Sequence, residues 1–424
     1  MSSNLVRISI QNLQLGHYVH LELSWIDHPF SLNKFKLTTP DQLATLRGLR
    51  LQNLLVDLSK SDVRSASPVD SSPQPIENTA AVPDPAQSEA IIRKRERIAQ
   101  NQALRSRVAV AERQFMQGAR VCRELNQTIF SNPRESLGQV SALITQAADA
   151  LLTNRDAIVH LLGDRVGGEE VYHHSLNVSM LALLLGKELG LSRETLETIG
   201  LAAVLHDIGK VEVPTQILLK RDTWTAPERE LFRQHVAFGT TILQKAGVSQ
   251  SVLDIVAQHH EMADGSGYPK GLKADQMLEG GRLLSLVNEY DNLCNPTDFN
   301  KAMTPHEALS LMFSKYRTRF DAAMMSKFVH ILGVYPPGCV VALSNEAVGM
   351  VMSVNASKPL RPVVLVYDEN IPKSEAIILN LEEEPGIAIA KALRPNQLAR
   401  PVYDYLSPRQ RITYSFDTQP GAES

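Results

Sequence analysis

The sequence lacks any long apolar run, which excludes one class of protein at the outset. Its longest apolar stretch, residues 180–185, falls far short of the roughly 18 residues that a membrane-spanning helix needs. The amino terminus also has no charged start followed by an apolar core, so it does not read as a signal peptide. We therefore expect a protein without a membrane span.

A basic excess and paired cysteines are also missing. The formal net charge is −3, whereas a surface that binds a nucleic-acid polymer usually shows a strong basic excess. The three cysteines, Cys122, Cys294 and Cys339, are widely spaced and form no zinc pattern and no disulfide framework. These absences favour a protein of the reducing cytoplasm whose ligand is not a nucleic-acid polymer.

The chain of 424 residues is long enough for two or three domains, and its amino-terminal part divides into three pieces. Residues 1–60 read as a small β-rich module, because polar and apolar side chains alternate around residues 7–10 and 18–23. Residues 61–87, rich in Ser, Pro, Asp and Ala, predict a linker. Residues 88–134 predict an exposed connector helix. A coiled coil that dimerises or transmits a signal is the alternative, but no sustained heptad seam supports it.

The remainder of the chain divides into a helical part and a β-rich part. Residues 135–335 read almost wholly as helices. Residues 336–424 return to short β-branched runs, at 340–343, 348–351 and 362–366, separated by Asn, Ser, Gly and Pro. The sequence thus predicts a mainly α protein with small β-rich segments at both ends.

The helical region carries histidines and carboxylates in two suggestive pairs. Glu170 and His174 are one helical turn apart, so they share a helix face and could reach one ion; a surface pair is the alternative. His206 and Asp207 follow five apolar residues, 201–205. Buried carboxylates are normally paired or bound to a metal, although a hydrogen-bonded His–Asp pair also satisfies the pattern.

A further histidine follows in the next helix. Thr225 and Glu228 form a capping box at the start of that helix, with Pro227 in its first turn, and His235 lies on the same helix. Taken alone, His235 reads as a structural residue.

Two adjacent histidines end the helix after that. His259 continues an inward apolar stripe and should point into the core, and His260 follows it. The next residues, 261–269, hold two glycines and a proline around Tyr268. Such a loop can approach a ligand closely, and an ordinary helix-ending turn is the alternative.

Together these residues predict a metal centre. Nitrogen and oxygen ligands without cysteine favour Fe, Mn, Co or Ni over a structural zinc ion. More ligands than one ion can hold imply at least two ions, and paired ions suit the hydrolysis of phosphate esters.

The motifs resemble those of the HD-GYP phosphodiesterases over roughly residues 150–333. The resemblance is carried by His174, by the segments 206–210 and 259–261, by His235 and by the 264–269 loop, Asp-Gly-Ser-Gly-Tyr-Pro. The amino-terminal module, with Trp25 and the segment 28–30, is similar to a domain of unknown function often fused to this family. The resemblance implies an HD-type helical bundle that cleaves cyclic di-GMP to linear pGpG, with GMP as a further product.

The resemblance also implies roles for particular residues. The family's metal ligands match His174, His206, Asp207, His235, His259 and His260, and Glu170 matches the extra carboxylate of members with a third ion. These positions imply two or three divalent ions, with Fe or Mn expected. Lys210 matches the lysine near the scissile phosphate, where it would stabilise developing charge, and with Asp207 it forms the expected catalytic pair. The substrate loop matches Asp264, Gly267, Tyr268 and Pro269.

The chain departs from the family pattern at two places. Asn288 holds the position of the family's last aspartate ligand; an amide oxygen can coordinate but brings no charge. Asp291, one helical turn further on, could partly compensate. The basic residues that usually hold substrate phosphate are replaced by Thr297 and Asn300, with Lys301 adjacent.

Two alternatives to a cyclic di-GMP phosphodiesterase stay open at this stage. One is a degenerate module that binds a diguanylate cyclase or another signalling protein, and the other is a hydrolase of another cyclic dinucleotide or nucleotide. A homodimer is compatible with each of them.

Overall fold

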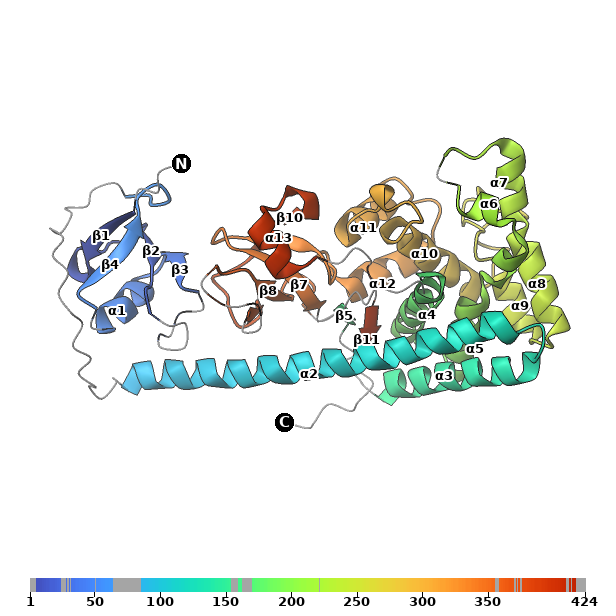
Figure 1. Ribbon diagram of the computed structural model, residues 1–424, viewed down its shortest axis with the longest axis horizontal. Helices are drawn as coiled ribbons and strands as arrows, with labels where there is room; N and C mark the ends of the chain where they lie inside the picture. The colour runs from blue at the N-terminus through green and yellow to red at the C-terminus, as the bar shows by residue number, and fades with distance from the viewer. Residues whose placement is uncertain are drawn as a thin grey trace. The chain divides into compact units, whose positions relative to one another are not determined.

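The computed structural model describes residues 5–23, 28, 30, 32–49, 51–63, 85–153, 159–161, 170–220, 222–354, 358–369, 371, 373, 376–408, 412 and 414–416 (Figure 1). The chain forms two compact units. The first comprises Met1–Arg105, Leu343–Val348 and Leu365–Leu379, and the second comprises Ser106–Ala342, Gly349–Val364 and Asn380–Ser424. Among the described residues, no helix combines the length and the apolar character that crossing a membrane requires.

The amino-terminal module is a four-stranded antiparallel sheet with one helix. The strands are β1 (Leu5–Ser9), β2 (Tyr18–His20), β3 (Lys34–Lys36) and β4 (Asn53–Asp57), in the order β1-β4-β2-β3. Helix α1 (Pro40–Gly48) begins at a capping box between Thr39 and Gln42. The predicted alternation is confirmed, with Ile8, Val19 and Val56 buried in the core, although β2 ends earlier than the sequence suggested.

The helical prediction for the second unit is confirmed. Two long helices, α2 (Pro85–Thr128) and α3 (Pro133–Thr153), are joined by a tight turn and lie side by side (Figure 1). The other helices are α4 (Glu170–Glu188), α5 (Arg193–Leu205), η3 (Ile208–Glu212), α6 (Thr215–Leu218), α7 (Ala226–Arg233), α8 (His235–Lys245), α9 (Gln250–Val256), α10 (Glu279–Cys294), η4 (Phe299–Lys301), α11 (Pro305–Ser314) and α12 (Ala322–Leu332).

Helix α4 is the central helix of this bundle. From Ser175 to Gly186 every residue is buried, and α3, α5, α10 and α12 pack around it. A helix that is apolar on all sides must be enclosed in this way, which explains the apolar run at residues 180–185. Because α4 carries His174 near its beginning, the core of the bundle fixes the position of that histidine.

A seven-stranded sheet is formed mostly by strands that follow the bundle in sequence, joined by one strand from between α3 and α4. Its strands are β5 (Val159–Leu161), β6 (Val340–Leu343), β7 (Val348–Val354), β8 (Val363–Val366), β9 (Ile377–Asn380), β10 (Ile389–Leu393) and β11 (Tyr414–Phe416). The order is β10-β6-β7-β5-β11, and β8 pairs with both β7 and β9. The three predicted strands are confirmed as β6, β7 and β8. The short strands β5 and β11 carry too few residues for a period-2 pattern, and helix α13 (Arg400–Leu406) was likewise not predicted.

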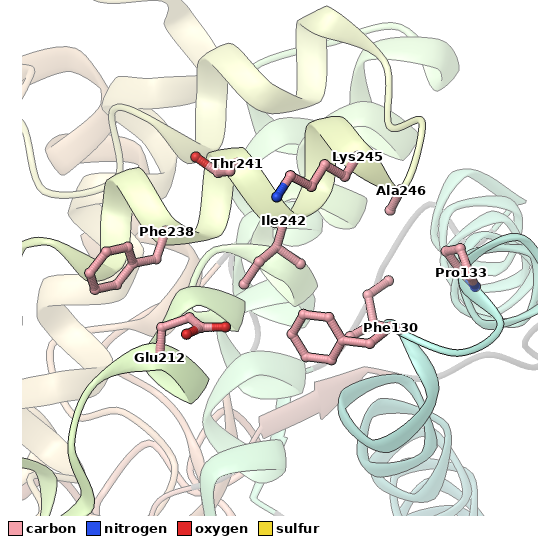
Figure 2. Close-up of a pocket in the computed structure, with 9 residues that line it drawn as sticks. Phe130, Pro133, Glu212, Phe238, Thr241, Ile242, Lys245 and Ala246 are labelled. Atoms are coloured by element: carbon pink, nitrogen blue, oxygen red, sulfur yellow. The ribbon is translucent and has the colours of Figure 1, made fainter.

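A pocket of about 440 Å³ lies between the α2–α3 turn, η3 and α8 (Figure 2). Phe130 points into it from the turn, and Glu212 and Phe238 face it from η3 and α8. Its lining includes no histidine and no aspartate. The pocket lining therefore contains none of the predicted metal ligands.

Candidate metal centre

One group of ligand-type side chains comes from α4 and from the end of α5. His206 caps the carboxyl end of α5, and Asp207 follows it directly before η3. The Nε2 atoms of His174 and His206 are 3.2 Å apart. Asp207 Oδ2 lies 3.5 Å from His174 Nε2 and 3.3 Å from His206 Nε2. These three side chains therefore converge on one point.

A second group shares the same aspartate. His235 begins α8, and His259 and His260 lie in the turn that follows α9. The Nε2 atoms of His235 and His259 are 3.2 Å apart, and they lie 3.6 Å and 3.8 Å from Asp207 Oδ1. His260 completes this group of four. Each oxygen of Asp207 thus faces a different set of histidines.

Hydrogen bonds at the other ring nitrogen determine the tautomers of these histidines. The Nδ1 atoms of His206, His235 and His259 donate to the carbonyl oxygens of Ala203, Phe232 and Val256, at 2.6–2.7 Å. A carbonyl oxygen can only accept, so each Nδ1 carries the proton. In the neutral ring the lone pair is then on Nε2, the atom that points into the site.

In each of the two Nε2 contacts, two neutral rings therefore point their lone pairs at each other. If both rings are protonated, two like charges face each other instead. Neither arrangement is favourable by itself, so each pair needs a cation between its nitrogens, either one shared proton or a metal ion. Burial lowers the pKa of His235 and of His259, which disfavours the proton in that pair. Atoms that share an ion through bonds of about 2.1 Å lie roughly 3.0–3.4 Å apart, which matches both 3.2 Å separations. Asp207 Oδ1 supports the same conclusion, because it has no hydrogen-bond donor among the described residues. The donor set fits metal ions.

The electrostatics keep the ligands in their metal-binding forms. Burial lowers the pKa of His259 and His260 well below the usual value, and neighbouring histidines lower it further. Burial opposes the charge on Asp207, but the charges of His206 and Lys210 outweigh it and hold its pKa well below the usual range. At neutral pH these two histidines are neutral and the aspartate is ionised, as a metal requires.

The loop after His260 closes over the second group. Glu261 is fully buried, and its two carboxylate oxygens accept hydrogen bonds from the main-chain nitrogens of Lys270 and Leu272. A Cβ atom on Gly267 would lie 2.4–2.5 Å from main-chain atoms of residues 260–262, so only glycine fits. Glu261 and Gly267 thereby hold the loop against the histidines.

Two predicted substrate residues have different surroundings in this loop. The ring of Tyr268 stacks on His260, with centroids 4.6 Å apart, and Cζ of the Arg233 guanidinium lies over the same ring, 4.9 Å from its centroid. Asp264 instead accepts hydrogen bonds from Ser266 and from Thr318, so its carboxylate supports the loop. Tyr268 is the residue placed beside the metal ligands, with Pro269 next to it in sequence.

Lys210 joins the centre from η3. Its Nζ atom donates to Asp207 Oδ2 at 2.5 Å and lies 5.6 Å from the centroid of the Phe232 ring. The side chain is 27% exposed, so its charge can also reach a ligand in the site.

We predict that Gly209→Ala damages this centre through the backbone. A Cβ atom on Gly209 would lie 2.0 Å from the His235 carbonyl oxygen and 2.4 Å from Gly239 N, so η3 and α8 would have to separate. Overpacking of this kind costs about 1–3 kcal/mol, so urea denaturation should show a lower free energy of unfolding. Metal content should fall with it. Gly138→Ala is the control, since no atom lies within 4 Å of its added Cβ; equal stability of the two variants would contradict the prediction.

The structure revises two details of the sequence interpretation. The capped helix α7 ends at Arg233, and His235 begins a separate helix, α8, because the chain turns at Gln234. Helix α9 ends at Val256, so His259 and His260 lie in a turn after it. His259 nevertheless points inward as predicted and is fully buried.

The remaining predicted ligands have mixed outcomes. Asn288 is buried, and its Oδ1 accepts a hydrogen bond from Asn292, so its role as a ligand stays a prediction. Asp291 does not replace it directly, because Asp291 Oδ2 accepts from His174 Nδ1 instead. Helix α4 begins at Glu170, whose side chain lies outside the described part of the structure.

Sequence reasoning missed two residues behind His174. Asn177 and Asn295 both donate to Asp291 Oδ1, so the carboxylate that holds His174 is itself held. The only signal in the sequence was the spacing of His174 and Asn177 on one helix face, which any amphipathic helix could show.

Comparison with known families finds matches along most of the chain. A model described as HD domain matches residues 142–324. A domain of unknown function (DUF3391) matches residues 5–140, and a KOW domain associated with HD domain matches residues 340–400.

Several curated relatives are enzymes. The cyclic di-GMP phosphodiesterase PA4108 of Pseudomonas aeruginosa is 30% identical over 374 residues, which cover 86% of this chain and 85% of that protein. The 3'3'-cGAMP-specific phosphodiesterase 3 of Vibrio cholerae is 28% identical over 225 residues, 50% of this chain and 49% of that protein. Among solved structures, Bd1817, a HDG"Y"P protein from Bdellovibrio bacteriovorus, covers 78% of this chain and 99% of its own, with 16% identity and a TM-score of 0.43.

Proposed function

This chain belongs to the HD-GYP family of cyclic di-GMP phosphodiesterases, and on that premise we propose that it hydrolyses cyclic di-GMP to pGpG, with GMP as a further product. The observation that carries the proposal is the pair of histidine sets bridged by Asp207, with Lys210 beside them. We propose two divalent ions, Fe or Mn, one for each set. A third ion would require Glu170.

The ions, when bound, supply Lewis acidity to phosphate oxygens and lower the pKa of water. The protein's own residues do the rest. Four Nδ1 hydrogen bonds hold the histidine rings of His174, His206, His235 and His259 in one orientation, so no reorganisation is needed on binding. Lys210 places a positive charge where negative charge develops on the phosphate. Tyr268, which contacts both His260 and Arg233, places an aromatic ring beside the site.

Domain roles are part of the same proposal. We assign the chemistry to residues 135–335. Most of the predicted linker, residues 64–84, lies outside the described residues. The HD match at residues 142–324 and the position of every described ligand support this assignment of the chemistry.

The test is turnover by the purified full-length protein. Protein prepared without oxygen and loaded with Mn²⁺ or Fe²⁺ should convert cyclic di-GMP to pGpG, as separated by chromatography, and a chelator should stop the reaction. 3'3'-cGAMP is the comparison substrate, because a relative is named for it. Absence of turnover with every divalent ion would sink the proposal, and faster cleavage of 3'3'-cGAMP would reassign the substrate.

We predict that Asn288→Asp tightens metal binding. Asn288 lies one turn before Asp291 on the buried face of α10, and an added carboxylate close to a cation is worth about 4 kcal/mol before desolvation at an effective dielectric constant near 20. We therefore expect the Kd of one ion to fall about tenfold or more, while the metal-free protein melts at a lower temperature because it buries a charge. Equilibrium dialysis with Mn²⁺ measures the first effect. Asn380→Asp adds the same charge elsewhere; equal affinity in the two variants would place residue 288 outside the ligand set.

A further inference from the structure

The orientation of His174 depends on one buried carboxylate. His174 Nδ1 donates to Asp291 Oδ2 at 2.5 Å, which leaves the lone pair of Nε2 facing His206 and Asp207. Asp291 is 1% exposed, so no bulk water can take the place of this bond. Whatever fixes Asp291 therefore fixes one ligand of the metal centre.

The side-chain amides of two asparagines donate hydrogen bonds to the other oxygen of that carboxylate. Asn295 Nδ2 donates to Asp291 Oδ1 at 2.9 Å, and Asn177 Nδ2 donates to the same oxygen at a shorter separation. Asn177 comes from α4, and Asn295 caps the carboxyl end of α10. Both amides must present NH₂ rather than oxygen to Asp291, because two facing oxygens would repel.

The main chain of Ile412 and of Tyr414 sets the orientation of both amides. Ile412 N donates to Asn295 Oδ1 at 2.7 Å, and Tyr414 N donates to Asn177 Oδ1 at 2.7 Å. The Ile412 carbonyl accepts from Asn295 Nδ2 at 2.8 Å and from Asn177 Nδ2 at 3.3 Å. A main-chain N–H can only donate, so each amide oxygen must face that N–H and each NH₂ must face Asp291 and the Ile412 carbonyl.

Strand pairing and burial fix the position of Tyr414, two residues after Ile412. Strand β11 pairs antiparallel with β5, which precedes α4 in sequence. Tyr414 is fully buried, its hydroxyl lies 2.8 Å from the Tyr290 hydroxyl, and it donates to the Pro337 carbonyl. Ile412 and Tyr414 both lie beyond the matched HD domain, 142–324, and beyond the matched KOW domain, 340–400.

We infer that Ile412 and Tyr414 are positioning residues of the metal centre, acting through Asn177, Asn295 and Asp291 on His174. The inference rests on the metal centre of the proposed function. If these two residues only stabilised the fold, changes in them would lower the melting temperature and leave metal affinity unchanged. If they position His174, the same changes selectively weaken the ion held by His174, His206 and Asp207 while the ion at His235, His259 and His260 stays bound.

The test removes single donors in the full-length chain. Ile412→Pro deletes the N–H that donates to Asn295, and Ile412→Val keeps it with nearly the same side chain. Asn295→Asp keeps the shape and the acceptor for Ile412 N–H but cannot donate to Asp291. Asn380→Asp, which alters an asparagine bonded to Glu383, is its control.

Metal affinity is measured by titrating the metal-free proteins with Co²⁺ and following the visible absorption bands. We expect Ile412→Pro and Asn295→Asp to raise the Kd of one ion about 10–100-fold, with the other ion and both controls unchanged. Wild-type affinity for both ions in folded Asn295→Asp overturns the inference, even if Ile412→Pro fails to fold. The titration uses no substrate, so failure of the proposed function would appear separately, as absence of turnover by fully loaded wild-type protein.

Discussion

Replacing Asp207 by asparagine should abolish cyclic di-GMP hydrolysis, lowering kcat/KM by about 1000-fold or more. Asp207 is the one residue shared by both histidine sets, and its two oxygens face different sets. An amide offers one oxygen and no charge, so the two histidine sets would no longer share a carboxylate that could serve an ion in each of them. The loss of several kcal/mol of metal-derived transition-state stabilisation corresponds to about three factors of ten in rate.

The same substitution should leave the fold intact, which makes the result interpretable. The charges of His206 and Lys210 outweigh the cost of burying the Asp207 charge, so a neutral side chain of the same shape should lower the free energy of unfolding of the metal-free bundle while keeping its packing. Circular dichroism melting of the metal-free variant checks the fold, and elemental analysis after loading checks the metal. Asp275→Asn, at an exposed position, is the control and should retain both ions. Full activity with unchanged metal content in Asp207→Asn would contradict the bridging role.

Sequence alone could identify the residues that face the core but not how they meet. The five apolar residues before His206 predicted that this histidine and Asp207 are buried, and the structure confirms it. The stripe before His259 predicted its inward direction equally well. Hydrophobic periodicity is a local property, so it fixes which side of its own helix a residue occupies.

The missing parts of the site are those that depend on contacts between distant segments. Asn177 and Ile412 are 235 residues apart and share a direct hydrogen bond. Ile412 lies two residues before β11, whose three-residue pairing with β5 has no sequence pattern of its own. The two hydrogen bonds that Glu261 accepts come from main-chain nitrogens, so no side chain in the sequence indicates them. The family resemblance identified the predicted metal ligands, whereas the residues that hydrogen-bond to those ligands became visible only in three dimensions.

The second large effect is expected at Lys210. Lys210→Met keeps an unbranched aliphatic side chain and removes the charged Nζ, which lies 5.6 Å from the centroid of the Phe232 ring and donates to Asp207. Loss of one preorganised donor to a developing oxyanion typically lowers kcat about 100–1000-fold, so we expect a decrease in that range with metal content unchanged. Lys210→Arg should recover part of the rate, since it restores charge with a different shape. Lys327→Met is the control: that side chain is 43% exposed and lies beside Glu188.

The contact between Lys210 and Asp207 permits a second explanation that the same variant can separate. If the lysine acts chiefly by holding Asp207, its removal should weaken both ions, and excess metal should restore the rate. If it acts on the substrate, Co²⁺ affinity stays at the wild-type value and no metal concentration rescues kcat. The 27% exposure of Lys210 against 4% for Asp207 favours action on the substrate, because the charged end remains accessible from the site while the carboxylate is enclosed. Rescue by excess metal would therefore reassign Lys210 from a catalytic residue to a positioning one.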